Sequence, residues 1–350
     1  MNNKQIKMAI VGCGEHSHAH AKAIKKIKEI DLISCCDIEE NKAIEWAIKY
    51  GCPSHYTNIN KMIDNEKIDA IILCTWPKQH LEQIKICLSS GIKNILCEKS
   101  LALTTDEAVE IWKMTKSHHA FLMEGCMYRH HPAIQKLERI LAYNDIGPID
   151  SIRAVFSNYE PEIDSINDIN LNWRLRHDYG GGVAYDWMSY CVNACNHFSG
   201  GTPQRVYATG NISNKYQVIN RIYGMIEYDN GNVGIIESSK NANFSEMLQI
   251  TCVNSILQLP IAWGIYGEVN ILQHHRKEDW DYILTDKYKI EEADSFYLQL
   301  KNFCAVIKEN DNPVIPLKES IINISTIESL VNSLTSKKII DIQNIQFNND

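Results

Sequence analysis

The point near the N-terminus where a short apolar run meets a glycine pair constrains the fold more than any other feature. Met8-Ala9-Ile10-Val11 is predicted to be a buried strand, and Gly12-Cys13-Gly14 follows at once. A helical pattern of apolar residues begins near His18. This order is typical of folds that hold a pyrophosphate at a helix N-terminus, where backbone N–H groups are free. Ser17 replaces a usual third glycine and is small enough to allow close packing.

The first 125 or so residues alternate strand-like and helix-like segments, which predicts a doubly wound parallel sheet. Further strands are expected at Ile68 to Cys74, Asn94 to Cys97 and Ala120 to Glu124. Thr104 and Glu107 form a capping box that predicts the start of a helix through Trp112. Four residues fall just after predicted strands, at the edge where such a sheet binds ligands. They are Gly14, Asp37, Thr75 and Lys99.

Asp37 indicates which dinucleotide this edge would hold. A carboxylate at the end of the second strand accepts hydrogen bonds from the ribose hydroxyls and repels a 2′-phosphate. The following Ile38-Glu39-Glu40 supplies no basic group. We therefore expect NAD, with NADP less favoured. The candidate cofactor-binding residues are Gly12, Cys13, Gly14, Glu15, His16, Asp37, Ile38, Thr75, Trp76, His80, Glu98 and Lys99.

The pattern changes from about residue 147 to longer strand-like stretches. They include Ile152 to Phe156, Arg205 to Ala208 and Ile222 to Tyr228. Asp229-Asn230-Gly231-Asn232 predicts a hairpin turn into Val233 to Ile236. This half is expected to be an α+β domain with a large, mainly antiparallel sheet, ending in helices at Phe296 to Lys308 and Leu317 to Ser336. For 350 residues we expect two domains, 1–125 and 126–350.

A second glycine run, Gly180-Gly181-Gly182, precedes a segment without Gly or Pro up to Gly200. Glycines allow positive φ and a close approach to a bound molecule. The segment is predicted to be a helix, on which Asp186 and Tyr190 share one face because they are four residues apart. We interpret them as an acid–base pair for proton transfer.

Composition excludes several classes of function. The formal net charge of −8 comes with no basic patch, which argues against a nucleic-acid partner. No apolar run approaches the length of a membrane span, and the N-terminus has no secretory pattern, so we expect a cytoplasmic protein. The twelve cysteines form no CxxC pair, and His16, His18 and His20 have no ligand partners at useful spacing. We therefore expect neither a metal site nor disulfides.

Four motifs together resemble the Gfo/Idh/MocA oxidoreductase family over nearly the whole chain. They are Val11-Gly12-Cys13-Gly14, Cys97-Glu98-Lys99, Met127 to Pro132 and Gly180 to Asn193. The resemblance implies a Rossmann domain beside a large-sheet domain. It also implies NAD(P)-dependent hydride transfer to or from a hydroxyl or ketone of a sugar, cyclitol or nucleotide sugar. Lys99 and Asp186 match the family's catalytic positions.

Tyr190 stands where the family most often has His, and in this it resembles the glucose–fructose oxidoreductase-like branch. The resemblance implies that Tyr190 exchanges a proton with the substrate oxygen, while Lys99 polarises that oxygen and lowers the pKa of the phenol. Asp186 would orient Lys99 or relay the proton. Two residues depart from the pattern. Ser100 replaces the proline after Lys99, and Met188 replaces a glycine.

The substrate contacts are expected at aromatic residues beside arginines, which suit a sugar face plus a phosphate or carboxylate. The candidates are Tyr128, Arg129, Trp173 and Arg174. Ordinary packing and salt bridges explain each of them singly almost as well. A reductase of nucleotide-linked or phosphorylated sugars therefore stays open, as does a non-catalytic cofactor-binding regulator. By resemblance we also expect a homodimer or homotetramer formed through the C-terminal sheet.

Overall fold

The structure is a computed structural model that describes residues 5–143, 146–160, 172–264, 267–276, 283–309 and 311–347. By its internal contacts the chain divides into two compact units. The first unit comprises Met1–His130 and Asp294–Ile321, and the second comprises His131–Ala293 and Ile322–Asp350. The domain boundaries expected from the sequence, 1–125 and 126–350, stay a prediction. In the structure, Asp294–Ile321 belongs with the first unit.

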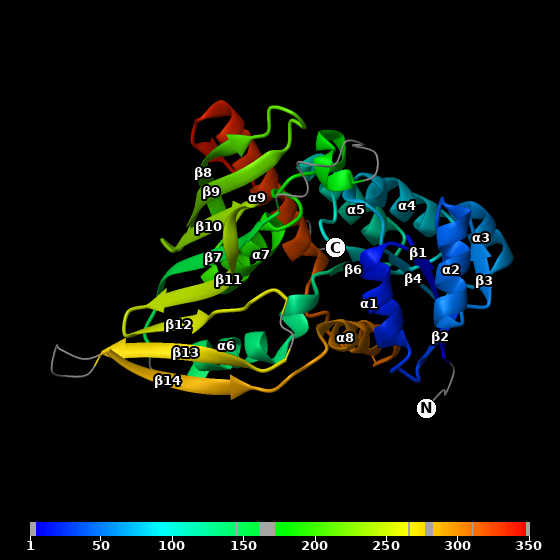
Figure 1. Cartoon of the computed structure of the whole chain (residues 1–350), viewed down its shortest axis with the longest axis horizontal. Coiled ribbons are helices and arrows are strands. Elements are labelled where there is room, and N and C mark those ends of the chain that lie inside the picture. Colours follow the sequence, from blue (N-terminus) through cyan, green and yellow to red (C-terminus); the bar gives the residue numbers. More distant parts are fainter. Residues whose placement is uncertain are drawn as a thin grey trace. The chain divides into compact units, whose positions relative to one another are not determined.

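The first unit is built on a six-stranded parallel sheet in the order β3-β2-β1-β4-β5-β6. Its strands are β1 (Ile6–Val11), β2 (Ile30–Cys36), β3 (Ser54–Tyr56), β4 (Ala70–Leu73), β5 (Asn94–Glu98) and β6 (Phe121–Gly125). Its helices are α1 (Glu15–Ile24), α2 (Glu40–Tyr50), α3 (Ile59–Asn65), α4 (Pro77–Ser89), α5 (Thr105–Ser117), the 3-10 helix η1 (Met127–His130) and α8 (Ser295–Glu309). The predicted doubly wound parallel sheet is confirmed (Figure 1).

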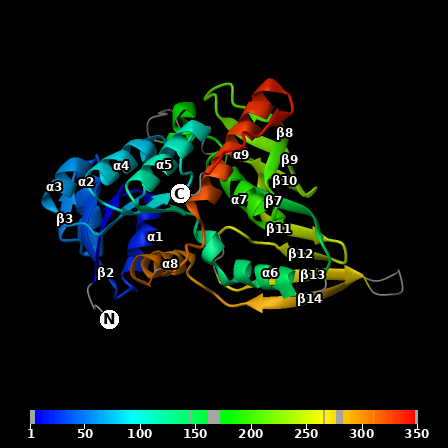
Figure 2. The same cartoon turned by 180° about the vertical axis from the view of Figure 1, so that it is seen from behind.

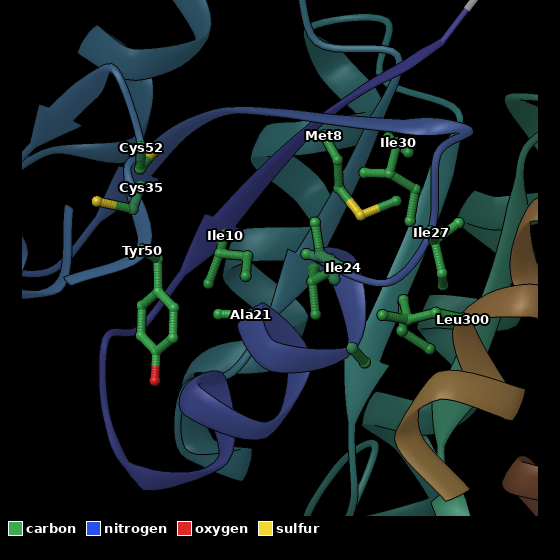
Figure 3. Packing of buried hydrophobic residues seen from close by; sticks show 14 of the residues in the cluster. Met8, Ile10, Ala21, Ile24, Ile27, Ile30, Cys35, Tyr50, Cys52 and Leu300 are labelled. Atoms are coloured by element: carbon green, nitrogen blue, oxygen red, sulfur yellow. The ribbon is translucent and has the colours of Figure 1, made fainter. Parts of the chain in front are cut away.

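The core of the first unit explains why a segment from the far end of the chain belongs there. Met8 and Ile10 of β1 are fully buried in one cluster with Ile24 of α1. Leu300 of α8 joins the same cluster, and it lies beside Ile24 and Ile27 (Figure 3). Burial of this apolar surface fastens α8 to the sheet, with each fully buried side chain of this size contributing about 2 kcal/mol.

Local sequence sets the helix ends. The Thr104 side chain accepts a hydrogen bond from the Glu107 amide at 3.2 Å, and the Glu107 carboxylate accepts one from the Leu103 amide at 2.9 Å. This confirms the predicted cap at the start of α5. Helix α1 begins at Glu15, three residues before the expected start near His18, because the Ser17 amide already donates to the Gly14 oxygen at 3.1 Å.

The second unit is built on a nine-stranded sheet in the order β14-β13-β12-β11-β7-β10-β9-β8-β15. Its strands are β7 (Ile149–Tyr159), β8 (Pro203–Ile212), β9 (Ile219–Tyr228), β10 (Val233–Ser239), β11 (Asn241–Cys252), β12 (Ser255–Leu259), β13 (Val269–Arg276), β14 (Ile283–Ile290) and β15 (Ile340–Asp341). β10 pairs with β7 in parallel, and the other pairs are antiparallel. The sheet is therefore mixed and mainly antiparallel, as predicted.

The helical elements of the second unit are α6 (Pro132–Tyr143), η4 (Trp173–Leu175), η5 (His177–Tyr179), α7 (Met188–Ser199) and α9 (Leu317–Ser336), the last from Ile322 onward. α7 packs against β7 and β10, and α6 lies along β13 (Figures 1 and 2). The predicted hairpin between β9 and β10 is present, with Gly231 at φ +87°. Within the described ranges, no helix is long and apolar enough to cross a membrane.

Candidate active site

The glycine turn after β1 lies tightly against the end of β4. Gly12 has φ +89°, and a Cβ atom there would come within 2.7 Å of the Cys74 carbonyl oxygen. The Gly12 amide donates to the Cys36 oxygen at 2.8 Å. Only glycine satisfies both the positive φ and the close approach. The turn is therefore held between the carboxyl ends of β2 and β4.

Asp37 lies at the end of β2 and is held by backbone amides. Its carboxylate accepts hydrogen bonds from the Cys13 amide at 2.8 Å and from the Glu39 amide at 2.9 Å. A carboxylate has about four acceptor sites, so two remain for a ligand. This is the arrangement expected of a residue that binds ribose hydroxyls.

A cavity of about 260 Å³ opens beside this turn, wholly within the first unit. Of the candidate cofactor-binding residues, it is lined by Gly12, Gly14, Asp37, Ile38, Thr75 and Trp76. Six further polar residues of its lining were not among the candidates, namely Glu39, Lys42, Thr57, Asn58, Gln79 and Gln83. The spacing in the sequence could have indicated Lys42, because it lies three residues after Glu39 at the start of a helix. In the structure the two side chains form an ion pair at 2.5 Å.

The other candidate cofactor-binding residues of the first unit lie outside the lining of this cavity. They are Cys13, Glu15, His16, His80, Glu98 and Lys99. Glu98 is buried and forms an ion pair with His20 of α1, Nε2 to Oε1 at 2.7 Å. Burial acts to raise the pKa of Glu98, but the hydrogen bond and charge of His20 outweigh it and leave the pKa lowered.

The backbone that follows Lys99 is fixed by two buried side chains. His80 of α4 bridges two loops, with Nδ1 3.0 Å from the Ser100 oxygen and Nε2 3.1 Å from the Thr75 oxygen. Glu124 of β6 accepts a hydrogen bond from the Leu101 amide at 2.9 Å. The Lys99–Ser100 peptide bond is cis. The position of Lys99 at the end of β5 thus rests on β6 and α4.

In the second unit, the glycine run Gly180 to Gly182 packs closely against the chain's own backbone. A Cβ on Gly181 would come within 2.7 Å of three backbone oxygens. They belong to Trp173, Arg174 and Arg176. Gly180 and Gly182 have φ of +78° and +87°. The close approach of Gly181 is therefore to the chain's own backbone, and the approach of the glycine run to a bound molecule stays a prediction.

Asp186 precedes the helix that was expected to carry it. α7 begins at Met188, and the amides of Trp187 and Met188 both donate to the Val183 oxygen, at 3.0 and 2.9 Å. These turns end before regular helix begins, so Asp186 and Tyr190 do not share one helix as predicted. Asp186 is 2% exposed and forms an ion pair with Arg174, Oδ2 to Nε at 2.6 Å.

Tyr190 lies in the first turn of α7 within an aromatic cluster. Its ring centroid is 5.6 Å from that of Phe156 and 6.0 Å from that of Trp263. Phe156 in turn stacks on Trp187 at 5.2 Å with the rings 10° from parallel. The sequence analysis missed Phe156, which lies on β7, and Trp263, which lies after β12 and whose indole N–H donates to the Val155 oxygen of β7 at 2.8 Å. The cluster surrounds the Tyr190 ring with aromatic side chains, of which Trp187 and Trp263 are buried and Phe156 is half-buried.

The remaining substrate candidates, Tyr128 and Arg129, are both buried in η1 of the first unit. The Arg129 guanidinium pairs with Glu319 at the start of α9, which accounts for the arginine without a substrate. Trp173 lies in η4, where the Arg174 guanidinium is 5.2 Å from its ring centroid. Their role in substrate binding stays a prediction. In the described part of the chain, no group of three or more His, Cys, Asp or Glu side chains is arranged to hold a metal ion.

Comparison with known protein families identifies the family to which the two units belong. Residues 6–126 match the family described as "Oxidoreductase family, NAD-binding Rossmann fold", and residues 134–258 match the "GFO/IDH/MocA C-terminal domain". The chain belongs to the Gfo/Idh/MocA oxidoreductase family. The first unit is accordingly the NAD(P)-binding Rossmann part of an oxidoreductase.

Individual relatives of this Gfo/Idh/MocA protein are distant. The chain is 24% identical over 308 residues to D-xylose 1-dehydrogenase (NADP(+)) 2 of Haloferax volcanii, covering 87% of this chain and 90% of that one. It is 24% identical over 320 residues to trans-1,2-dihydrobenzene-1,2-diol dehydrogenase of Mus musculus, covering 90% and 92%. A solved levoglucosan dehydrogenase in complex with NADH and L-sorbose shares the fold, with a TM-score of 0.86, 17% identity and coverage of 98% and 100%.

Glu124 makes the stability of the first unit depend on pH. Burial raises the pKa of this carboxyl to about 7 from 4.5. The folded state therefore favours the neutral form, whose stabilising contribution is complete below about pH 4.5 and is lost as the pH rises through about 7. Glu124→Gln should stay neutral and keep an acceptor for the Leu101 amide. We expect it to be more stable than the wild type by about 3 kcal/mol at about pH 8.5 and equally stable at about pH 4.5.

Urea unfolding at these two pH values measures the difference. The exposed Glu292→Gln serves as the control and should show no pH-dependent gain. A gain for Glu124→Gln that is the same at both pH values would contradict the assignment.

Proposed function

We propose that the protein is an NAD-dependent dehydrogenase or reductase that interconverts a secondary hydroxyl and a ketone on a sugar or cyclitol. The observation that carries this proposal is the buried Asp186, held by Arg174 one turn before Tyr190 in an aromatic cluster. A buried carboxylate next to a phenol suits proton transfer, and aromatic rings suit the apolar face of a sugar ring. The relatives named for D-xylose, levoglucosan and a cyclic diol support the same class of reaction.

The residues of the first unit fit the dinucleotide. A Cβ at Gly12 would fill the space against Cys74, and the carboxylate of Asp37 lines the cavity with acceptor sites to spare. Gly12 and Gly14 would hold the pyrophosphate at the start of α1, and Asp37 would hold the ribose. The chemistry that NAD supplies when bound is the acceptance of a hydride at its nicotinamide ring.

Proton transfer is the task of three side chains. Tyr190 takes the proton of the substrate hydroxyl at Oη during oxidation and returns it during reduction. The Lys99 ammonium donates a hydrogen bond to the same substrate oxygen and stabilises the negative charge that develops there. Asp186 orients the donor groups and is itself held by its ion pair with Arg174. Tyr190 at the position where His is commoner supports the proposal that the protein belongs to the glucose–fructose oxidoreductase-like branch.

Tyr190→Phe should abolish turnover, because the ring stays but the proton-transfer group is lost. We expect kcat to fall by about 100-fold or more, with an unchanged Kd for NADH because the dinucleotide cavity is formed by the first unit. The assay follows NADH absorbance over a panel of free sugars, cyclitols, phosphorylated sugars and nucleotide-linked sugars.

The exposed Tyr143→Phe is the matched control and should retain full activity. Retained activity in Tyr190→Phe would refute its role. Turnover of nucleotide-linked sugars alone would replace the proposed substrate class.

The preference for NAD follows from the negative charge at the end of β2. Asp37 and Glu39 line the cavity and repel a 2′-phosphate, and Lys42 is already paired with Glu39. Fluorescence titration should give tighter binding of NADH than of NADPH. Asp37→Asn should lower this preference by about tenfold, which corresponds to about 1.4 kcal/mol, while the exposed Asp31→Asn should leave it unchanged. Tighter binding of NADPH by the wild type would contradict the proposal.

We also propose that two copies pair through the open face of the nine-stranded sheet. Tyr207, Met225 and Ile235 are neighbours across β8, β9 and β10, and they are 45%, 48% and 39% exposed. Such a row of exposed apolar side chains is typical of a subunit interface. Light scattering should give at least a dimer, and Met225→Asp should shift it to the monomer. A wild-type monomer would contradict this.

A further inference from the structure

Lys240 is a buried lysine beside Asp186 that the sequence analysis did not single out. It occupies the turn between β10 and β11, and its residue is 6% exposed. Among the described residues it is the lysine that falls in the buried class. Lysine is rarely buried, because removing an ammonium from water is costly unless the charge is compensated. A buried lysine next to a proposed reaction site therefore calls for a function.

The backbone fixes where this side chain begins. The Lys240 amide donates to the Asn220 oxygen at 2.9 Å, and the Lys240 oxygen accepts from the Glu160 amide at 3.2 Å. The turn is thus fastened to β9 on one side and to the end of β7 on the other. From this anchor Nζ reaches to 5.0 Å from the centroid of the Trp187 ring, next in sequence to Asp186.

The ammonium is surrounded by charges but is incompletely hydrogen-bonded. Its nearest anionic partner is Glu160, whose Oε2 lies 3.5 Å from Nζ, long for a charge-assisted hydrogen bond. Within the described ranges Nζ has no hydrogen bond of ordinary geometry. Burial lowers the pKa of Lys240, Asp186 and Glu160 raise it, and Arg174 lowers it, with a net lowering. The group therefore has donors available close to Asp186.

The charges of this cluster also bear on the substrate. Arg174 pairs with Asp186, and Lys240 faces Glu160, so two cations stand against two anions. A phosphate or carboxylate on the substrate would disturb this balance, whereas a neutral hydroxyl accepts a hydrogen bond from Nζ without adding charge. Phe156, which stacks on the buried Trp187, is half-buried and is the ring of this pair that supplies aromatic surface for a sugar ring.

We infer that Lys240 is a substrate-binding residue, whose ammonium donates a hydrogen bond to a hydroxyl of a neutral polyol ring. This rests on the proposed function, in which Asp186 and Tyr190 act on that ring. Lys240 thereby selects neutral polyhydroxylated substrates over phosphorylated ones and over rings that lack the contacted hydroxyl. A site built to bind a hydroxyl rejects the analogue that lacks it, because its own polar group is then left unpaired.

Binding rather than turnover tests this inference. The NADH-saturated protein is titrated with myo-inositol, its monodeoxy analogues and D-xylose by calorimetry, for the wild type, Lys240→Met, Lys240→Arg and the exposed control Lys287→Met. We expect Lys240→Met to raise the Kd of the polyols by about tenfold or more, with an intermediate effect for Lys240→Arg and none for the control. The Kd for NADH should not change in any variant.

The analogues separate substrate contact from a structural role. The wild type should bind one monodeoxy analogue more weakly than its parent, and Lys240→Met should bind the two alike. Equal Kd values in wild type and Lys240→Met, the same discrimination in both, or no polyol binding to the wild type would each overturn the inference. If Lys240→Met does not fold, Lys240→Arg is judged by the same discrimination. A failure of the proposed function is distinguished by a separate assay. In that case the wild type forms no NADH with any sugar or cyclitol.

Discussion

The approach of Gly12 to the Cys74 carbonyl is the contact on which the cofactor site depends. A Cβ would lie 2.7 Å from that oxygen, so the turn after β1 reaches the end of β4 only with glycine. Held there, Cys13 donates its amide to Asp37 at the end of β2. Three neighbouring strands of the parallel sheet are thereby joined around one cavity. The cavity lies at the carboxyl edge of the sheet. It can form because Gly12 has no Cβ atom that would clash with Cys74.

A similar constraint governs the second unit, with the chain itself as the partner. Gly181 lets the backbone of η4 lie against the glycine run, and η4 carries Arg174. Arg174 in turn neutralises the buried Asp186. A buried carboxylate is costly unless its charge is compensated. The close approach that Gly181 permits thus positions the arginine that compensates Asp186.

The fold and the first half of the candidate site could be predicted from sequence because their signals are local. The glycine turn, Asp37 at a strand end and the Thr104 cap each depend on residues close together in the chain. What depends on contacts through space could not be predicted. Asp186 precedes α7 rather than lying on it, and the ion-pair partner of Arg129 is Glu319, far along the chain. The residues that the sequence analysis missed in the second unit are brought together by pairing of the strands that flank them, which no single segment reveals. They are Phe156, Lys240 and Trp263.

The central proposal is that Lys99 and Tyr190 bind the same substrate oxygen. A crystal structure of the unreactive complex of the protein with NADH and a polyol measures this directly. We expect one hydroxyl oxygen of the polyol within about 3.2 Å of both Lys99 Nζ and Tyr190 Oη. A polyol bound at the Asp186 cluster with Lys99 or Tyr190 beyond hydrogen-bond reach of that oxygen would contradict the claim.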